Sequence, residues 1–173
     1  MQEKTAWFKA KDGDNRIRIL TKPVKFFERF SEATKKSVIM DAYEEGVSTK
    51  YLSFIVDYTD GKIVLYKLPG SVGKEVATLM QSDEYKFEEF PMPYDITVKK
   101  TGEGKETRYS VLPARMNSDL SIDIMEELGS LNDCAKILEA MKKKQGQTTQ
   151  SNINSVMAPA IEYPKNDGTE IPF

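Results

Sequence analysis

Histidine is absent from this chain of 173 residues, and cysteine occurs only once, at Cys134. A single cysteine excludes an intrachain disulfide. A structural zinc ion needs four nitrogen or sulfur ligands, so this composition also excludes an ordinary zinc site. Without histidine the most common general base is missing, and no nucleophile elbow, phosphate-cradling glycine motif or metal cluster can be recognised. We therefore expect a protein that is not an enzyme and that needs no cofactor.

Long apolar runs are also missing. No run approaches the roughly 18–20 residues that cross a membrane, and the first residues lack the apolar run of a signal peptide. The hydrophobic content of 39% and the charged content of 30% are typical of a soluble globular protein. We therefore expect no membrane partner and a reducing cytoplasmic environment.

Charge is distributed unevenly along the chain, although the net charge is only −2. Residues 1–36 hold ten basic and five acidic residues, and residues 99–115 hold five basic and two acidic ones. Residues 37–98, between them, hold five basic and eleven acidic residues. A fold that brings the two basic segments together creates a positive face, as in nucleic-acid-binding proteins. The alternative is mixed charge that serves only solubility.

The first basic segment combines cations with aromatic side chains. A strand is predicted over 16–20, and its alternation predicts an outward cationic row that a phosphate backbone would contact. A basic-aromatic loop is predicted over 21–36, where one or two of the three phenylalanines are expected to face a ligand and the others to join the core. Stacking on an aromatic side chain contributes about 1–3 kcal/mol per base. The candidate residues are Arg16, Arg18, Lys22, Lys25, Phe26, Phe27, Arg29, Phe30, Lys35 and Lys36.

The second basic segment reads as a β-hairpin. Tyr94, Ile96 and Val98 alternate with polar residues, the turn 101–106 contains two glycines, and residues 107–112 alternate again. A positive hairpin tip beside Tyr or Thr suits a phosphate backbone, whereas a merely solvated hairpin is the alternative. The candidate residues are Lys99, Lys100, Lys105, Arg108, Tyr109 and Arg115.

The remaining pattern predicts strands over 37–44, 50–58 and 63–68, a helix over 72–81 with Ser71 as its N-cap, and helices over 122–128 and 132–144. The polar stretch from residue 145 onward is predicted to be disordered. It ends in an apolar tip that suits a protein partner, although an unstructured end without a partner is the alternative. The candidate partner-binding residues are Asp167, Glu170, Ile171, Pro172 and Phe173.

The order of these elements predicts a mainly β protein with an OB fold: a five- to six-stranded barrel, one helix between strands 3 and 4, C-terminal helices and a disordered tail. Residues 1–115 would form the OB domain with an N-terminal arm, residues 116–144 a helical extension packed on the barrel, and residues 145–173 the tail. In OB folds the loops between strands 1–2 and 4–5 flank the binding face. Those loops would be 21–36 and 101–106, which lie in the two basic segments.

Three stretches resemble bacteriophage single-stranded-DNA-binding proteins: Asp12–Leu20, the hairpin Tyr94–Val111 with its Gly102-x-Gly104 turn, and the end Ile171-Pro172-Phe173. The resemblance implies sequence-independent binding that protects single-stranded DNA during phage replication, recombination or repair in the cytoplasm of a bacterial host. It also implies that the tail recruits other replication or recombination proteins; self-association on DNA is left open. The chain departs from some family members in lacking a zinc insert, and its tip has few acids. An RNA-binding OB protein and a protein-interaction adaptor are the alternatives.

Overall fold

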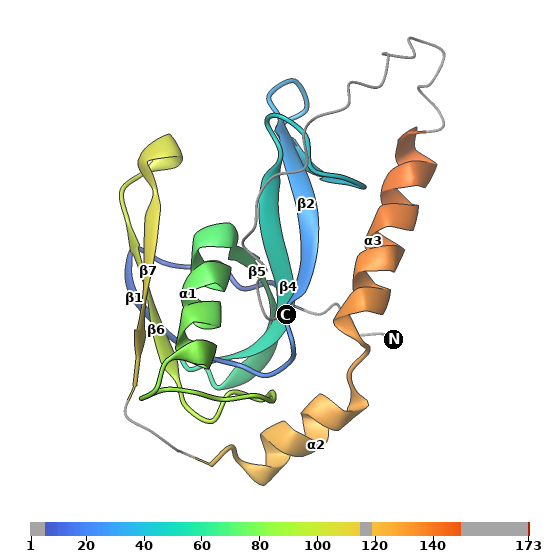
Figure 1. Ribbon diagram of the computed structural model, residues 1–173. Helices are drawn as coiled ribbons and strands as arrows, with labels where there is room; N and C mark the ends of the chain where they lie inside the picture. The colour runs from blue at the N-terminus through green and yellow to red at the C-terminus, as the bar shows by residue number, and fades with distance from the viewer. Residues whose placement is uncertain (1–5, 115–118, 150–172) are drawn as a thin grey trace.

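A computed structural model describes residues 6–114, 119–149 and 173 of the chain (Figure 1). Seven strands form one antiparallel sheet, and three α-helices pack around it in the described residues. The elements are β1 (Gly13–Ile19), β2 (Val24–Ser31), β3 (Lys36–Met40), β4 (Ser48–Asp57), β5 (Lys62–Pro69), α1 (Gly70–Gln81), β6 (Ile96–Thr101), β7 (Arg108–Pro113), α2 (Ile122–Ser130) and α3 (Cys134–Thr149).

Strand β4 is the centre of the sheet, which runs in the order β3-β2-β4-β1-β6-β7 with β5 on the other edge of β4. The first half of β4 pairs with β2 and its last residues pair with β1, while β5 pairs along most of its length. The mainly β prediction is confirmed. The count differs, since seven strands replace the expected five to six, and the described pairings form an open sheet rather than a closed barrel.

Three local predictions are wrong. The expected loop over 21–36 contains strand β2, which pairs with both β3 and β4. The N-cap of α1 is Pro69 rather than Ser71, and no side chain of the described residues caps the start of this helix. The predicted disordered tail begins too early, because α3 continues to Thr149; the tail from 150 to 172 lies outside the described residues.

The sheet is buried on both faces, because its long strands alternate two sets of apolar side chains. One face, called here the α1 face, packs against α1 through residues such as Tyr51, Tyr66 and Val98. Helix α1 lies so close to β4 that a Cβ on Gly73 would come within 2.5 Å of the Tyr51 ring. The other face, the α3 face, packs against α3 through residues such as Phe54.

The two end strands of the sheet path, β3 and β7, each contact a helix at their outer edge. The side-chain amide of Gln145 in α3 donates to the Ile39 carbonyl at 2.9 Å and accepts from the Ile39 N–H at 2.8 Å, at the edge of β3. At the edge of β7, the Glu75 carboxylate of α1 accepts the Val111 N–H at 2.6 Å. Such contacts satisfy backbone groups that an open edge would leave exposed.

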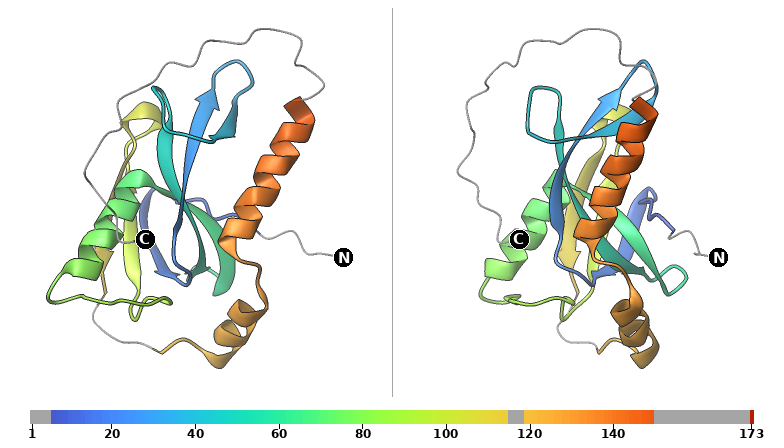
Figure 2. Two further views of the ribbon diagram at one scale, coloured as in Figure 1. Left: turned by 45° about the vertical axis from the view of Figure 1, so that its right-hand side comes forward. Right: turned by 90° about the vertical axis from the view of Figure 1, so that its right-hand side faces the viewer.

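Two hairpins, β2–β3 and β6–β7, extend toward the same end of the molecule (Figures 1 and 2), and α1 lies between them in the view of Figure 1. The turn of the second hairpin contains Gly102 at φ 78° and Gly104 at φ 53°, in agreement with the two glycines expected there. A Cβ on Gly102 would lie 2.3 Å from the Glu106 carbonyl oxygen, so glycine is needed at this position. No described helix has the length and apolar character required to cross a membrane.

Candidate nucleic-acid interface

Strand β2 places an alternating row of basic and aromatic side chains on the α1 face. Lys25 pairs across the sheet with Tyr51, which belongs to the α1-face core, so Lys25, Phe27 and Arg29 share that face. The Lys25 Nζ lies 5.6 Å from the centre of the Phe27 ring. The Phe27 ring in turn meets Tyr43 edge to face, with 6.0 Å between centroids. We call Lys25, Phe27, Arg29 and Tyr43 the β2 row.

The second hairpin contributes to the same face of the sheet. Lys100 and Tyr109 are cross-strand partners, and they continue the inward positions of the buried Val98 and Val111 toward the hairpin tip. Both side chains are half-buried, and Tyr109 packs against the edge of the α1-face core. The α1 face therefore carries basic and aromatic side chains on both of the hairpins that flank α1.

Lys99 and Arg108 lie on the opposite side of this second hairpin, because they alternate with Lys100 and Tyr109 along β6 and β7. Lys105 is exposed in the turn between the strands. Arg115 lies outside the described residues. The hairpin tip thus presents cations in more than one direction, rather than on a single face.

The candidate cations divide into those with and those without an acidic partner. The Arg29 guanidinium lies 3.0 Å from the Glu44 carboxylate, and Lys35 and Lys100 pair with Glu32 at 2.7 Å and with Asp12 at 3.4 Å. Arg108 reaches Glu106 only at 4.0 Å. Exposed pairs of this kind contribute about 0–1 kcal/mol, so a phosphate can replace the carboxylate at little cost. The candidates with no acidic partner among the described residues are Lys22, Lys25, Lys36, Lys99 and Lys105.

The prediction of an outward cationic row is wrong for Arg18, whereas Arg16 does face outward. Arg18 is buried, and its Nε donates to the Asp95 Oδ1 at 2.7 Å. Arg16 is exposed but donates to the Asp95 Oδ2 through Nε at 3.0 Å and Nη2 at 2.6 Å, and its guanidinium lies 5.3 Å from the Tyr58 ring centre. One buried carboxylate therefore ties both arginines to the start of β6, and we assign the pair a structural role.

The ionisation of Asp95 agrees with that role. Burial acts to raise the pKa of Asp95, but hydrogen bonds from Tyr58, Arg16 and Arg18, together with the Arg18 charge, outweigh burial and hold the pKa below its usual value. Burial, and then the hydrogen bond to Asp95, raise the pKa of Tyr58. The carboxylate is thus charged in the folded protein, and the network stays intact at neutral pH.

The three candidate phenylalanines have three different environments. Phe26 is buried in the α3-face core, so it is not available to a ligand. Phe27 is half-buried in the β2 row, and Phe30 is 53% exposed on the α3 face. Phe26 is thus the one of the three that joins the core, and alternation along β2 separates it from Phe27. That one or two of the three face a ligand stays a prediction.

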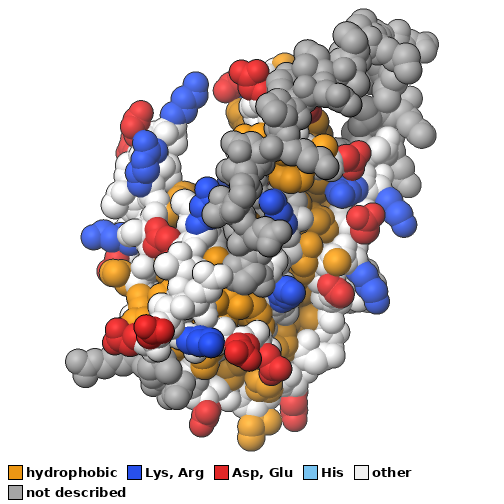
Figure 3. Space-filling view, in the orientation of Figure 1, with side chains coloured by type: hydrophobic (Ala, Val, Ile, Leu, Met, Phe, Trp, Pro, Cys, Tyr) orange, Lys and Arg blue, Asp and Glu red, His pale blue; other side chains and the backbone are white. Residues whose placement is uncertain are grey.

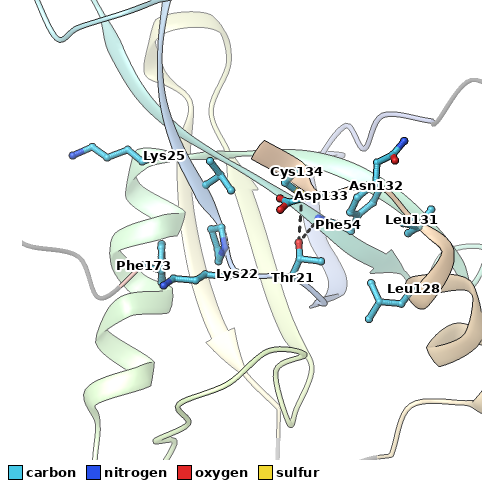
Figure 4. Close-up of a pocket in the computed structure, with 12 residues that line it drawn as sticks. Thr21, Lys22, Lys25, Phe54, Leu128, Leu131, Asn132, Asp133, Cys134 and Phe173 are labelled. Atoms are coloured by element: carbon cyan, nitrogen blue, oxygen red, sulfur yellow. Dashed lines mark hydrogen bonds between the residues drawn. The ribbon is translucent and has the colours of Figure 1, made fainter. Parts of the chain in front are cut away.

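A pocket of about 690 Å³ lies beside the connection between β1 and β2 (Figure 4). Lys22 and Lys25 line it together with Phe173, the last residue of the chain. Phe173 is half-buried, and its ring meets those of Tyr51 and Phe90 edge to face at 5.4 Å and 6.4 Å. The structure therefore places the terminal phenylalanine against the sheet of its own chain. The other predicted tip residues, Asp167, Glu170, Ile171 and Pro172, lie outside the described residues.

The surface seen in the orientation of Figure 1 carries charged side chains of both signs. Figure 3 shows Lys and Arg side chains at the tip of the β6–β7 hairpin, where acidic side chains accompany them, and near the middle of this view, while several acidic side chains gather along its lower edge. The acidic connector between α1 and β6 contains exposed Asp83, Glu84, Glu88 and Glu89. Acidic side chains are thus most numerous at the lower edge of this view, and the two signs are mixed elsewhere on this side.

Two exposed aromatic residues were not among the predicted site residues. Tyr43 is 56% exposed and completes the β2 row from the loop after β3. Trp7 is 42% exposed, and its neighbour Phe8 is the residue of the N-terminal arm that packs against the core. No clear signal in the sequence marks Tyr43, because its loop lies outside the basic segments.

Comparison of the chain with models of protein families, with curated proteins and with solved structures found no match.

Proposed function

We propose that this protein binds single-stranded DNA without sequence preference. The observation that carries the proposal is the β2 row together with Lys100 and Tyr109, which put cations and aromatic rings on the two hairpins flanking α1. Single strands expose both the phosphates that cations neutralise and the base faces that aromatic rings stack on. Duplex DNA keeps its bases stacked inside, so the aromatic members of the row favour single strands.

The topology supports an OB-type assignment. The path β5-β4-β1-β6-β7 has the strand order 3-2-1-4-5 of an OB fold, and α1 follows β5 in the chain. In this mapping, β2 and β3 form a hairpin inserted between barrel strands 1 and 2, and residues 102–107 form the loop between strands 4 and 5. Both are the regions that flank ligands in OB folds, and both contain cations without an acidic partner.

The resemblance to bacteriophage single-stranded-DNA-binding proteins adds a biological role to the proposal. That role is protection of DNA exposed during replication, recombination or repair in a bacterial host, with the tail recruiting other replication proteins. Because Phe173 packs against Tyr51 and Phe90, a partner that binds the tip has to displace this contact. Each ring contact of this kind is worth about 0.5–1.5 kcal/mol, which leaves the displacement feasible.

The proposal is tested by variants of the β2 row against a matched control. Affinity for a fluorescently labelled oligo-dT is measured by anisotropy for the wild type, for Lys25→Ala with Phe27→Ala, and for Lys62→Ala. Lys62 is an exposed lysine at the opposite end of β4, where that strand turns into β5. We expect the double variant to lose at least about tenfold in affinity, since it removes one stacked ring and one phosphate contact.

The control should bind like the wild type. Equal loss in Lys62→Ala would point to a general charge effect and contradict a defined site. Stronger binding of oligo-U than of oligo-dT would favour an RNA ligand. The triple variant of Lys99, Lys100 and Lys105 should lose affinity several-fold, and unchanged binding would remove the second hairpin from the site.

A further inference from the structure

The N-terminal arm is fixed to the free edge of β5 by its backbone. The Phe8 N–H donates to the Leu65 carbonyl at 2.7 Å, and the Leu65 N–H donates to the Ala6 carbonyl at 3.0 Å, which makes a parallel bridge at Trp7. The Phe8 ring then packs edge to face on Tyr66, with 4.7 Å between centroids. Two hydrogen bonds and one anchored ring therefore hold the arm in place.

The Trp7 side chain lies on the opposite side of the arm from the Phe8 side chain, and the arm is held in place without it. Its side chain is 42% exposed, although it is the only tryptophan in the chain and tryptophan is usually well buried. The Lys67 Nζ lies 5.4 Å from the centre of its ring. Lys67 pairs across the sheet with Leu52, so this contact lies on the α3 face, opposite the β2 row.

Further lysines lie in the same arm as Trp7. Lys9 and Lys11 are exposed in the same arm, and Lys67 keeps 33% of its side chain exposed. The Glu28 carboxylate, 3.1 Å from the Lys67 Nζ, is the acid that this lysine contacts. An exposed aromatic ring held rigidly beside several cations loses little conformational entropy when a base stacks on it.

We propose that Trp7 and Lys67 form a second contact site for single-stranded nucleic acid, with the Trp7 ring stacking on a base and Lys67 contacting a phosphate. This inference rests on the proposed function, because it extends the same ligand to the opposite face of the sheet. A strand that touches both sites has to pass around the sheet edge. Such a strand occupies more nucleotides than one confined to the α1 face.

The test uses the full chain and an oligo-dT of about 30 nucleotides, longer than the roughly 4–16 nucleotides that one OB fold covers. Binding is measured by anisotropy of a label on the oligonucleotide, and the emission of Trp7, the sole tryptophan, is recorded in the same titration. We expect Trp7 emission to be quenched as the complex forms. Trp7→Ala should weaken binding about 5- to 150-fold, the range expected for one lost stacked base, whereas Trp7→Phe should weaken it less. Lys67→Gln should reduce the salt dependence of binding.

The outcomes separate this inference from the proposed function. If the wild type binds no oligonucleotide at low salt, both are wrong. If it binds with unchanged Trp7 emission, and Trp7→Ala binds equally well, this second site is wrong while the proposed function stands. Circular dichroism shows whether Trp7→Ala is folded. If Trp7→Ala is unfolded, two other measurements test the second site. A stacking Trp7 should be quenched in the wild type, and Trp7→Phe should bind more weakly than the wild type because phenylalanine only partly replaces tryptophan.

Discussion

Replacing Asp95 by Asn should be among the most destabilising single substitutions in this protein. The change keeps the shape of the side chain but removes the negative charge that Arg16 and Arg18 share. Asp95 and Arg18 have side chains that are only 3% and 2% exposed, whereas that of Arg16 is 63% exposed. The buried half of the network therefore determines the energetic effect.

The expected magnitude follows from that burial. Removing one partner of a buried ion pair costs about 3–5 kcal/mol, because the remaining charge stays desolvated. For a chain of this size the loss corresponds to a decrease of about 6–20 °C in Tm. Arg16→Ala breaks only the exposed arm of the network and should cost about 0–1 kcal/mol.

Urea unfolding followed by circular dichroism measures both variants under the same conditions. The effect should also depend on pH. Because the folded-state pKa of Asp95 lies below its usual value, the charged carboxylate stabilises the folded state fully above the usual pKa of about 3.9, and this contribution is lost as the pH falls through the lower folded-state value. The difference between wild type and Asp95→Asn should therefore shrink in acid. A loss below about 1 kcal/mol, or a loss equal to that of Arg16→Ala, would refute a buried structural role.

Three further substitutions test other parts of the structure. Phe27→Ala should lower the affinity for oligo-dT by about 1–3 kcal/mol with unchanged Tm, and unchanged affinity in a binding titration would remove this ring from the site. Tyr66→Phe should preserve or raise the free energy of unfolding, by up to about 1–3 kcal/mol, because the buried Tyr66 hydroxyl has no hydrogen-bond partner in the described structure; a clear loss in urea unfolding would contradict this. Gln145→Ala should speed hydrogen exchange of the Ile39 amide, since it removes both contacts at the β3 edge, and an unchanged exchange rate would show that α3 does not protect that edge.

Several strands were predictable from the sequence. Segments 50–58 and 63–68 are rich in apolar β-branched and aromatic residues, segment 107–112 alternates, and each became a strand within a residue or two. The helix over 72–81 was also found, because its apolar positions repeat on one face. The local residue pattern was sufficient here, because the positions of the apolar residues in each segment indicate whether one or both of its faces are buried.

Strand β2 shows why the candidate site was predicted less well than the fold. The predicted OB order makes this segment the loop between strands 1 and 2, so the alternation of Lys25, Phe27 and Arg29 against Phe26 and Glu28 plays no part in the prediction. That alternation separates the buried Phe26 from the half-buried Phe27.

The pairing of Arg18 with Asp95 was beyond local reasoning, because the two residues lie 77 positions apart. The sequence alone does not distinguish a buried arginine from an exposed one, because the carboxylate that pairs with the buried arginine comes from a distant segment. The exposure of Trp7 has the same origin, since it depends on a bridge to Leu65 in a distant strand.

The most direct test of the central claim is the affinity for oligo-dT as a function of salt concentration, with duplex DNA and oligo-U as competitors. If Lys22, Lys25, Lys36, Lys99 and Lys105, the five candidate cations without an acidic partner, each neutralise one phosphate, log Kobs falls with log salt at a slope of about −3.5. We predict tight binding with a slope of this order and weak competition by duplex DNA. Absence of binding at low salt, or binding that is indifferent to salt and strandedness, would contradict the proposed function.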